Sequence, residues 1–127
     1  MAERQYKGFR VYAYIALARL FAALDLSLEA PDLLERAPAV IASPRERVSK
    51  EEILHAIRSN SHMTEKVLEY LLSEKYVTVG RDERGYDIRI TPAGVEHLRR
   101  YRQLYRELYA RELQVHYRYT GSPDWIR

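Results

Sequence analysis

The pattern of apolar positions changes several times along this chain, and the first stretch is apolar almost without interruption. Residues 9–27, FRVYAYIALARLFAALDLS, place apolar side chains on nearly every side of a helix, broken by Arg10, Arg19 and Asp25. Such a helix needs burial on most sides. A membrane span or a signal peptide is the alternative, but the apolar part is shorter than the roughly 20 residues of a span and contains Arg19. We therefore expect a core or dimer-interface helix.

Three prolines divide the following segment, residues 28–47. Because Pro31, Pro38 and Pro44 each disturb a helix, no long helix is expected to cross it. The segment predicts a connector with at most a short helical turn over 32–36 and no functional side chain. Its apolar residues are expected to pack over the core: Leu33, Leu34, Val40 and Ile41.

A pair of short amphipathic helices comes next. Ser49, with a glutamate three residues later, has the form of a capping box and predicts a helix over about 49–58. SNSHM, residues 59–63, is a polar break, and Thr64 is the expected cap of a second helix that runs to about Lys75. The apolar face of this second helix is expected to consist of Val67, Leu68, Leu71 and Leu72.

The pattern then switches to a period of two. YVTV, residues 76–79, and YDIRI, residues 86–90, predict two strands, and GRDERG between them predicts a turn. In the second strand, Tyr86, Ile88 and Ile90 are expected to face inward. Strands this short are not stable alone, so the hairpin must lie against the helices.

A long helix is predicted directly after the second strand, because Thr91 is a good cap and Pro92 a good first helical residue. Apolar positions then recur in steps of three and four with one polar interruption: Leu98, Tyr101, Tyr105, Leu108, Glu112, Val115 and Tyr119. This seam can pack on the first helix of the same chain, on a second copy, or on both. We expect a two-fold dimer, because the two helices carry more apolar surface than one small domain covers.

Length and composition limit the remaining possibilities. The 127 residues suit one domain, with a first helix at 9–27, a connector at 28–47, a core at 49–91, a last helix at 92–119 and a tail at 120–127. There is no cysteine, which excludes disulfides, zinc thiolates and thiol nucleophiles. A cytoplasmic location is the default, and the abundance of Arg, Glu and Tyr would fit a heat-adapted organism.

The order of helix, helix, turn, helix, hairpin and helix resembles a winged helix-turn-helix. Residues 49–105 are similar to the small dimeric regulators of the PadR, MarR and Sso10a kinds, an archaeal-like group. TEKVLEYLLSEKYVT resembles their recognition helix running into the first wing strand, and YDIRITPAGVEHL resembles their second wing strand with its Thr-x-x-Gly helix start. The resemblance implies a mainly α fold with a small β-hairpin, with long N- and C-terminal helices, in a cytoplasmic homodimer that regulates transcription.

The resemblance also implies a surface for double-stranded DNA, as a sequence-preferring or general binder. The second helix of the pair would enter the major groove by its N-terminal end, while the hairpin wing would touch the backbone or the minor groove. The implied DNA-binding residues are Arg58, Asn60, Ser61, His62, Thr64, Glu65, Lys66, Glu69, Tyr70, Arg81, Arg84 and Arg89. The implied dimer interface consists of Leu98, Tyr101, Tyr105, Leu108, Glu112 and Val115.

The charge pattern supports this function only weakly. The chain has 21 Lys+Arg and 18 Asp+Glu, a net charge of +3, so a nucleic-acid partner requires the positive charge to be clustered. Glu65 and Glu69 put negative charge on the helix, and three wing acids, Asp82, Glu83 and Asp87, offset the wing arginines. Winged helices also serve as protein-docking modules. The alternative is therefore a module for protein–protein interaction or a structural module in a larger complex, without direct DNA binding.

The sequence contains no recognisable motif of a catalytic or cofactor-binding site. The histidines His55, His62, His97 and His116 are scattered, and the glycines make no phosphate-binding loop. We expect no enzyme activity, no metal and no cofactor. Most of the 11 tyrosines fall at packing positions, and only Tyr70 and Tyr86 are placed where nucleic acid could meet them. No polar side chains are expected to converge between the first and last helices, so a small-molecule ligand is unknown.

Overall fold

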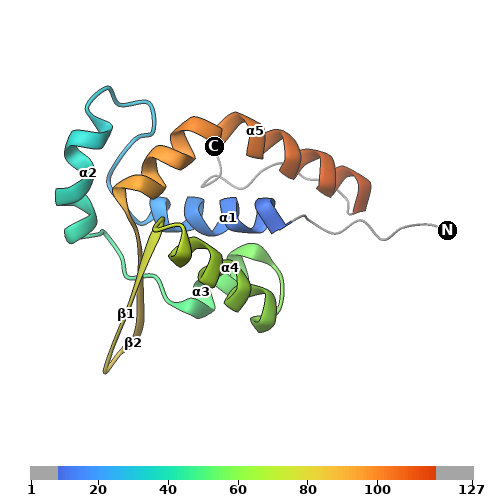
Figure 1. Cartoon of the computed structure of the whole chain (residues 1–127), viewed down its shortest axis with the longest axis horizontal. Helices are drawn as coiled ribbons and strands as arrows, with labels where there is room; N and C mark the ends of the chain where they lie inside the picture. Colours follow the sequence, from blue (N-terminus) through green and yellow to red (C-terminus); the bar gives the residue numbers. More distant parts are fainter. Residues whose placement is uncertain (1–8, 117–127) are drawn as a thin grey trace.

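The helix α1 (Phe9–Ala22) lies between the other helices of the chain (Figure 1). The structure, a computed structural model, describes residues 9–116, except for the side chains of Tyr105 and residues 108–116. Helix α1 packs against α5 (Pro92–His116) on one side and against α3 (Lys50–Ile57) and α4 (Ser61–Ser73) on the other. Nine of its 14 residues are buried, so the prediction of burial on most sides is confirmed. Its one deeply placed charge, Arg19, forms ion pairs with Glu46 (2.8 Å) and Glu52 (2.7 Å).

The connector contains a helix that the sequence analysis did not expect. Helix α2 (Leu33–Ala42) has ten residues and passes through Pro38, so the prediction of a short turn over 32–36 was wrong. Proline removes one backbone donor within the helix, but Leu33 and Ala37 on its inner face are completely buried. Burial of this face stabilises the helix despite the proline. The predicted packing of the connector over the core is confirmed, since Leu34, Val40 and Ile41 also lie against the core.

The helix pair consists of α3 (Lys50–Ile57) and α4 (Ser61–Ser73). Ser49 caps α3 as predicted, because its Oγ accepts a hydrogen bond from the backbone N–H of Glu52 at 3.2 Å. The residue Arg58, which ends α3, is in the left-handed region at φ 53° and turns the chain sharply toward α4.

Helix α4 begins four residues earlier than predicted, since its cap is Asn60 and not Thr64. The Asn60 Oδ1 accepts a hydrogen bond from the Met63 N–H at 2.8 Å. Thr64 lies in the first turn, where it is fully buried and its Oγ1 donates to the Asn60 carbonyl at 3.0 Å. The inner face is Val67, Leu68 and Leu71. The prediction that Leu72 faces inward was wrong, since 48% of it is exposed.

The wing is an antiparallel hairpin of β1 (Val77–Asp82) and β2 (Gly85–Ile90). Both strands run up to a two-residue loop, 83–84, so β1 is longer than predicted. The loop is possible because Gly85 adopts φ +106°, a backbone conformation that glycine tolerates. Ile88 and Ile90 are buried and Tyr86 is half-buried, which confirms the predicted inward face.

Helix α5 (Pro92–His116) starts directly after the wing, as predicted. The Thr91 Oγ1 accepts from the Gly94 N–H at 3.1 Å and donates to the Lys75 carbonyl at 2.6 Å. The helix packs along α1 and contacts α2. Leu98, a predicted dimer contact, is only 1% exposed and belongs to the core of its own chain. It is therefore not available at a dimer interface, because α1 already covers that side of α5.

Among the other predicted dimer contacts, Tyr101 is the one whose side chain the structure describes. Tyr101 is 39% exposed, whereas the side chains of Tyr105, Leu108, Glu112 and Val115 lie outside the described part of the chain, as does the tail. The described elements form the predicted mainly α fold with a small hairpin, in winged helix-turn-helix order. None of the described helices is long and apolar enough to cross a membrane.

Candidate nucleic-acid interface

Helices α3 and α4 and the wing all lie on the side of α1 opposite α5 (Figure 1). The wing projects from this side as an arm of two strands, and α4 presents its N-terminal end beside α3. This arrangement places residues 58–70 and 81–89, which are about 20 positions apart in the sequence, on the same side of α1. A single surface can therefore include both the start of α4 and the wing.

The start of α4 offers short polar and basic side chains. Ser61, His62 and Lys66 are exposed on its outer face, and Arg58 is exposed at the turn before it. Asn60 is also exposed, but its side-chain oxygen is occupied by the helix cap. Its amide NH₂ group can still donate to a base or a phosphate.

Thr64 does not belong to this surface. It was expected among the DNA-binding residues, but it is 0% exposed and its hydroxyl bonds to the Asn60 carbonyl. The error has the same origin as the misplaced cap: with α4 starting at Ser61, position 64 falls on the inner face of the helix.

One of the two acids of α4 is paired within the protein. Glu65 forms an ion pair with Lys50 at the start of α3, so its negative charge is partly compensated. Glu69 is exposed further along the helix. The Tyr70 ring packs edge-on against the Phe9 ring, with 5.4 Å between centroids, and 38% of Tyr70 remains exposed.

The wing arginines differ sharply in their surroundings. The Arg81 guanidinium lies 5.3 Å from the centroid of the Tyr86 ring, which Lys50 also approaches at 5.6 Å. Arg84 is exposed in the hairpin loop. Neither Arg81 nor Arg84 forms an ion pair with a carboxylate of the described residues.

Arg89, in contrast, is fully engaged within the protein. It forms a two-point contact with Asp87 at 3.1 and 3.3 Å. It also donates to the carbonyl oxygens of Ile41 and Ala42 at the end of α2. The Arg89 guanidinium therefore holds the wing to α2, and the expected contact of Arg89 with DNA stays a prediction.

The wing acid Asp82 is likewise bound from inside the molecule. Its carboxylate accepts hydrogen bonds from Arg47 at 2.6 and 2.9 Å and from the Arg84 backbone N–H at 2.8 Å. The bonds to the Arg47 side chain, and then that to the Arg84 N–H, lower the pKa of Asp82 from its ordinary 3.8 to about 2. The same contact raises the pKa of Arg47. Both groups are therefore charged at neutral pH.

Arg47 and Lys50 were missed in the sequence analysis, which expected no functional side chain in the connector that contains Arg47. Arg47 is separated from Asp82 by 35 positions, and no local pattern marks it. A useful signal would have been the excess of basic residues just before the cap Ser49, where Arg45 and Arg47 stand close together.

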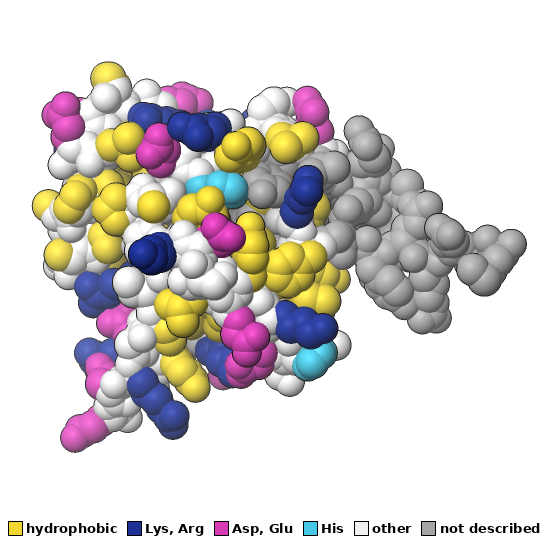
Figure 2. All heavy atoms as spheres, viewed as in Figure 1, with side chains coloured by type: hydrophobic (Ala, Val, Ile, Leu, Met, Phe, Trp, Pro, Cys, Tyr) yellow, Lys and Arg dark blue, Asp and Glu magenta, His cyan; other side chains and the backbone are white. Residues whose placement is uncertain are grey.

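The face of the protein drawn in Figure 2 does not carry one continuous basic patch. Figure 2 shows basic and acidic side chains interspersed along the projecting wing and over the helices beside it. The positive charge available for a partner therefore comes from particular residues, and three of the acids near them, Glu65, Asp82 and Asp87, are already paired.

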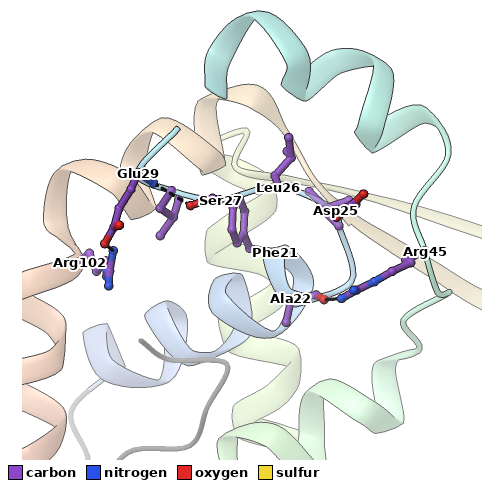
Figure 3. A pocket seen from close by; sticks show the side chains of 10 residues that line it. Phe21, Ala22, Asp25, Leu26, Ser27, Glu29, Arg45 and Arg102 are labelled. Atoms are coloured by element: carbon purple, nitrogen blue, oxygen red, sulfur yellow. Dashed lines mark hydrogen bonds and ion pairs between the residues drawn. The ribbon is translucent and has the colours of Figure 1, made fainter. Parts of the chain in front are cut away.

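A metal site or a cavity would be the other kind of place where a ligand could bind. Among the described residues, no group of three or more His, Asp or Glu side chains could hold a metal ion. A cavity of about 450 Å³ lies at the end of α1 (Figure 3). Its lining includes the charged side chains of Glu29, Arg45 and Arg102, of which only Arg102 comes from α5. The expectation that no polar side chains converge between the first and last helices stays a prediction. Arg102 donates to Glu29 across this cavity at 3.4 Å.

Comparison with known proteins adds little to these observations. No family model matches the sequence, and no curated protein matches it. The chain is similar to the crystal structure of MepR, a transcription regulator of the Staphylococcus aureus multidrug efflux pump MepA, with 13% sequence identity and a TM-score of 0.45. The match covers 84% of this chain and 76% of that chain. With values this low, fold and function must be argued from the residues of this chain.

Proposed function

We propose that this protein binds double-stranded DNA through the start of α4 and through the wing, as a dimeric transcriptional regulator. The observation that carries the proposal is the pairing of two of the three wing acids, with Glu83 exposed in the loop. Asp82 is bound by Arg47 and Asp87 by Arg89, which leaves Arg81 and Arg84 available for phosphates. Guanidinium groups bind phosphate oxygens strongly because they present several donors in one plane.

The start of α4 would supply contacts to the bases. Ser61 and His62 are short enough to approach base edges in the major groove, and Lys66 lies one turn further along the outer face. The proposed interface is then Arg58, Asn60, Ser61, His62, Lys66, Arg81 and Arg84, with Glu69 and Tyr70 at its border.

Binding to a random-sequence DNA duplex, followed by fluorescence anisotropy over a series of salt concentrations, tests the proposal. We expect log affinity to fall linearly with log salt, because phosphate contacts release counterions. Lys66→Glu, or Arg81→Glu combined with Arg84→Glu, should abolish binding without lowering the thermal unfolding temperature. Arg99→Glu, on the exposed side of α5, is the matched control and should bind nearly as the wild type does.

Dimerisation is the second part of the proposal. Tyr101 and Leu104 on α5 are 39% and 47% exposed, and a helix with such side chains is stabilised by a partner. A two-fold dimer would place two copies of α4 on DNA half-sites about one helical turn apart, roughly 34 Å. Sedimentation equilibrium of the free protein measures the oligomeric state directly.

The alternative, a protein-docking module, is favoured by one group of side chains. The Tyr76 ring stacks on the His97 ring with 4.5 Å between centroids, and the Tyr101 ring lies tilted against His97 at 4.9 Å. Leu72 and Leu104 are large apolar side chains that are also exposed. If the folded protein does not bind the duplex even at low salt, protein docking becomes the favoured function.

A further inference from the structure

One guanidinium group outside the wing holds the tip of the wing. Arg47 Nη2 and Nη1 donate to the two Asp82 oxygens at 2.6 and 2.9 Å. Its Nη2 also donates to the Gly85 carbonyl at 2.8 Å, and its Nε donates to the Tyr86 carbonyl at 3.2 Å. These acceptors lie on both strands, next to the loop that carries Arg84. Arg47 therefore connects both strands of the hairpin at its tip.

The backbone beside Arg47 is anchored in the core. Val48 is only 2% exposed, and its carbonyl accepts a hydrogen bond from the Ile88 N–H at 3.1 Å. The segment at 47–48 thus runs along the free edge of β2. Since the Arg47 side chain starts from this fixed point and ends at the tip, it sets the orientation of the tip relative to α3.

Arg47 also changes the charge balance of the wing. Residues 81–89 contain three arginines and three acids, so the wing by itself has no net charge. Asp82 already accepts from the Arg84 backbone N–H at 2.8 Å. Without Arg47, the Arg84 side chain would be the nearest cation for this carboxylate, and pairing with it would withdraw Arg84 from a phosphate.

We propose that Arg47 is a positioning residue for DNA binding: without touching DNA, it orients the wing tip and neutralises Asp82, so that Arg81 and Arg84 face the phosphates. This inference rests on the proposed function and deepens it. Arg47 lies in the connector before α3, outside the helix pair and the hairpin. The connector would therefore contribute to DNA binding as well.

A double-mutant cycle tests this role, with a random-sequence duplex as the probe. Arg47→Gln is measured in the wild type and in a variant that carries Arg81→Gln and Arg84→Gln. In the wild type we expect a loss of affinity on the order of tenfold and a salt slope reduced by about 1 to 2, the equivalent of one or two phosphates. In the variant without the two arginines, Arg47→Gln should cause no further loss. Arg36→Gln, which removes another ion-paired arginine, on α2, should change neither quantity.

Two results would overturn the inference. An equal loss in both backgrounds would mean that Arg47 touches DNA itself or supports the whole domain. Unchanged affinity and salt slope would mean that the wing is oriented toward DNA without the help of Arg47. Should Arg47→Gln fail to fold, the same cycle is run with Arg47→Lys, which keeps the charge but cannot reach all four acceptors. We expect Arg47→Lys to lose affinity only when Arg81 and Arg84 are present.

The failure of this inference can be told apart from the failure of the proposed function. If wild-type protein does not bind the duplex at low salt, both are overturned. If binding weakens when Arg81 and Arg84 are replaced but is indifferent to Arg47, the proposed function stands and only the positioning role of Arg47 is rejected.

Discussion

Gly94 lies directly against the backbone carbonyl of Tyr76, so closely that a Cβ at position 94 would overlap the carbonyl oxygen. The same Cβ would lie 2.7 Å from Cγ1 of Ile90. This contact joins the first turn of α5 to the chain just before the wing. Glycine is needed here for close approach and not for its φ angle.

We therefore expect Gly94→Ala to destabilise the protein by roughly 1–3 kcal/mol, because a backbone carbonyl cannot move aside as a flexible side chain can. Gly80→Ala is the matched control, since a Cβ there has its nearest neighbour at 3.6 Å, and its effect should stay within about 0.5 kcal/mol. Urea unfolding of both variants measures the difference. Equal stability of the two variants would contradict the close approach.

The cap of α4 allows a test of Asn60. Asn60→Ala should lower the free energy of unfolding by about 1 kcal/mol, because the Met63 N–H would lose its partner. Asn60→Ser keeps a capping oxygen and should retain most of the stability. If both variants unfold like the wild type, the side chain of Asn60 does not cap the helix.

Truncation to alanine should change the stability of the protein by very different amounts at two leucines of α5. Leu98 is 1% exposed, so Leu98→Ala should destabilise each protomer by about 2–5 kcal/mol through loss of apolar contact and formation of a cavity. Leu104 is 47% exposed, and Leu104→Ala should change the stability of the isolated protomer little. Thermal unfolding at low protein concentration, where protomers are separate, makes this comparison.

Leu104 also provides the test of the proposed dimer. Leu104→Glu places a charge on the exposed face of α5, and we expect sedimentation to show a shift from dimer to monomer while the circular dichroism spectrum is retained. Arg99→Glu is the control on the same helix. A stable dimer of Leu104→Glu would place the interface elsewhere.

Acid should loosen the wing over a defined pH range. The folded-state pKa of Asp82, about 2, lies below its ordinary value of 3.8. The contribution of this carboxylate is therefore fully present above about pH 4 and is lost as the pH falls through about 2. NMR titration of the Asp82 carboxyl, with hydrogen exchange of the Arg84 amide, follows the loss. In Arg47→Gln the pKa should rise toward 3.8; a value that stays near 2 would show that Arg47 is not the main cause.

Local signals in the sequence located several element boundaries, although α1 ends at Ala22 and not at 27. Ser49 with Glu52, and Thr91 with Pro92, begin helices where predicted, because caps depend on residues within one turn. The alternation at 86–90 likewise identified the inner face of β2. At the start of α4, Thr64 was the expected cap, whereas Asn60 caps the helix in the structure. The choice between them depended on which residues α1 and α3 could bury.

The sequence by itself determined the order of α1, the helix pair, the hairpin and α5, and the chemistry available at the start of α4 and in the wing. Only the tertiary structure decided which charges remain available to a partner. Arg81 and Arg89 look alike in the sequence, yet Arg89 is held by Asp87 and the end of α2. Asp82 is neutralised by Arg47, which lies 35 positions away. Pairs so distant in sequence form only when the fold brings their elements together, because ion pairing depends on separation in space and not along the chain.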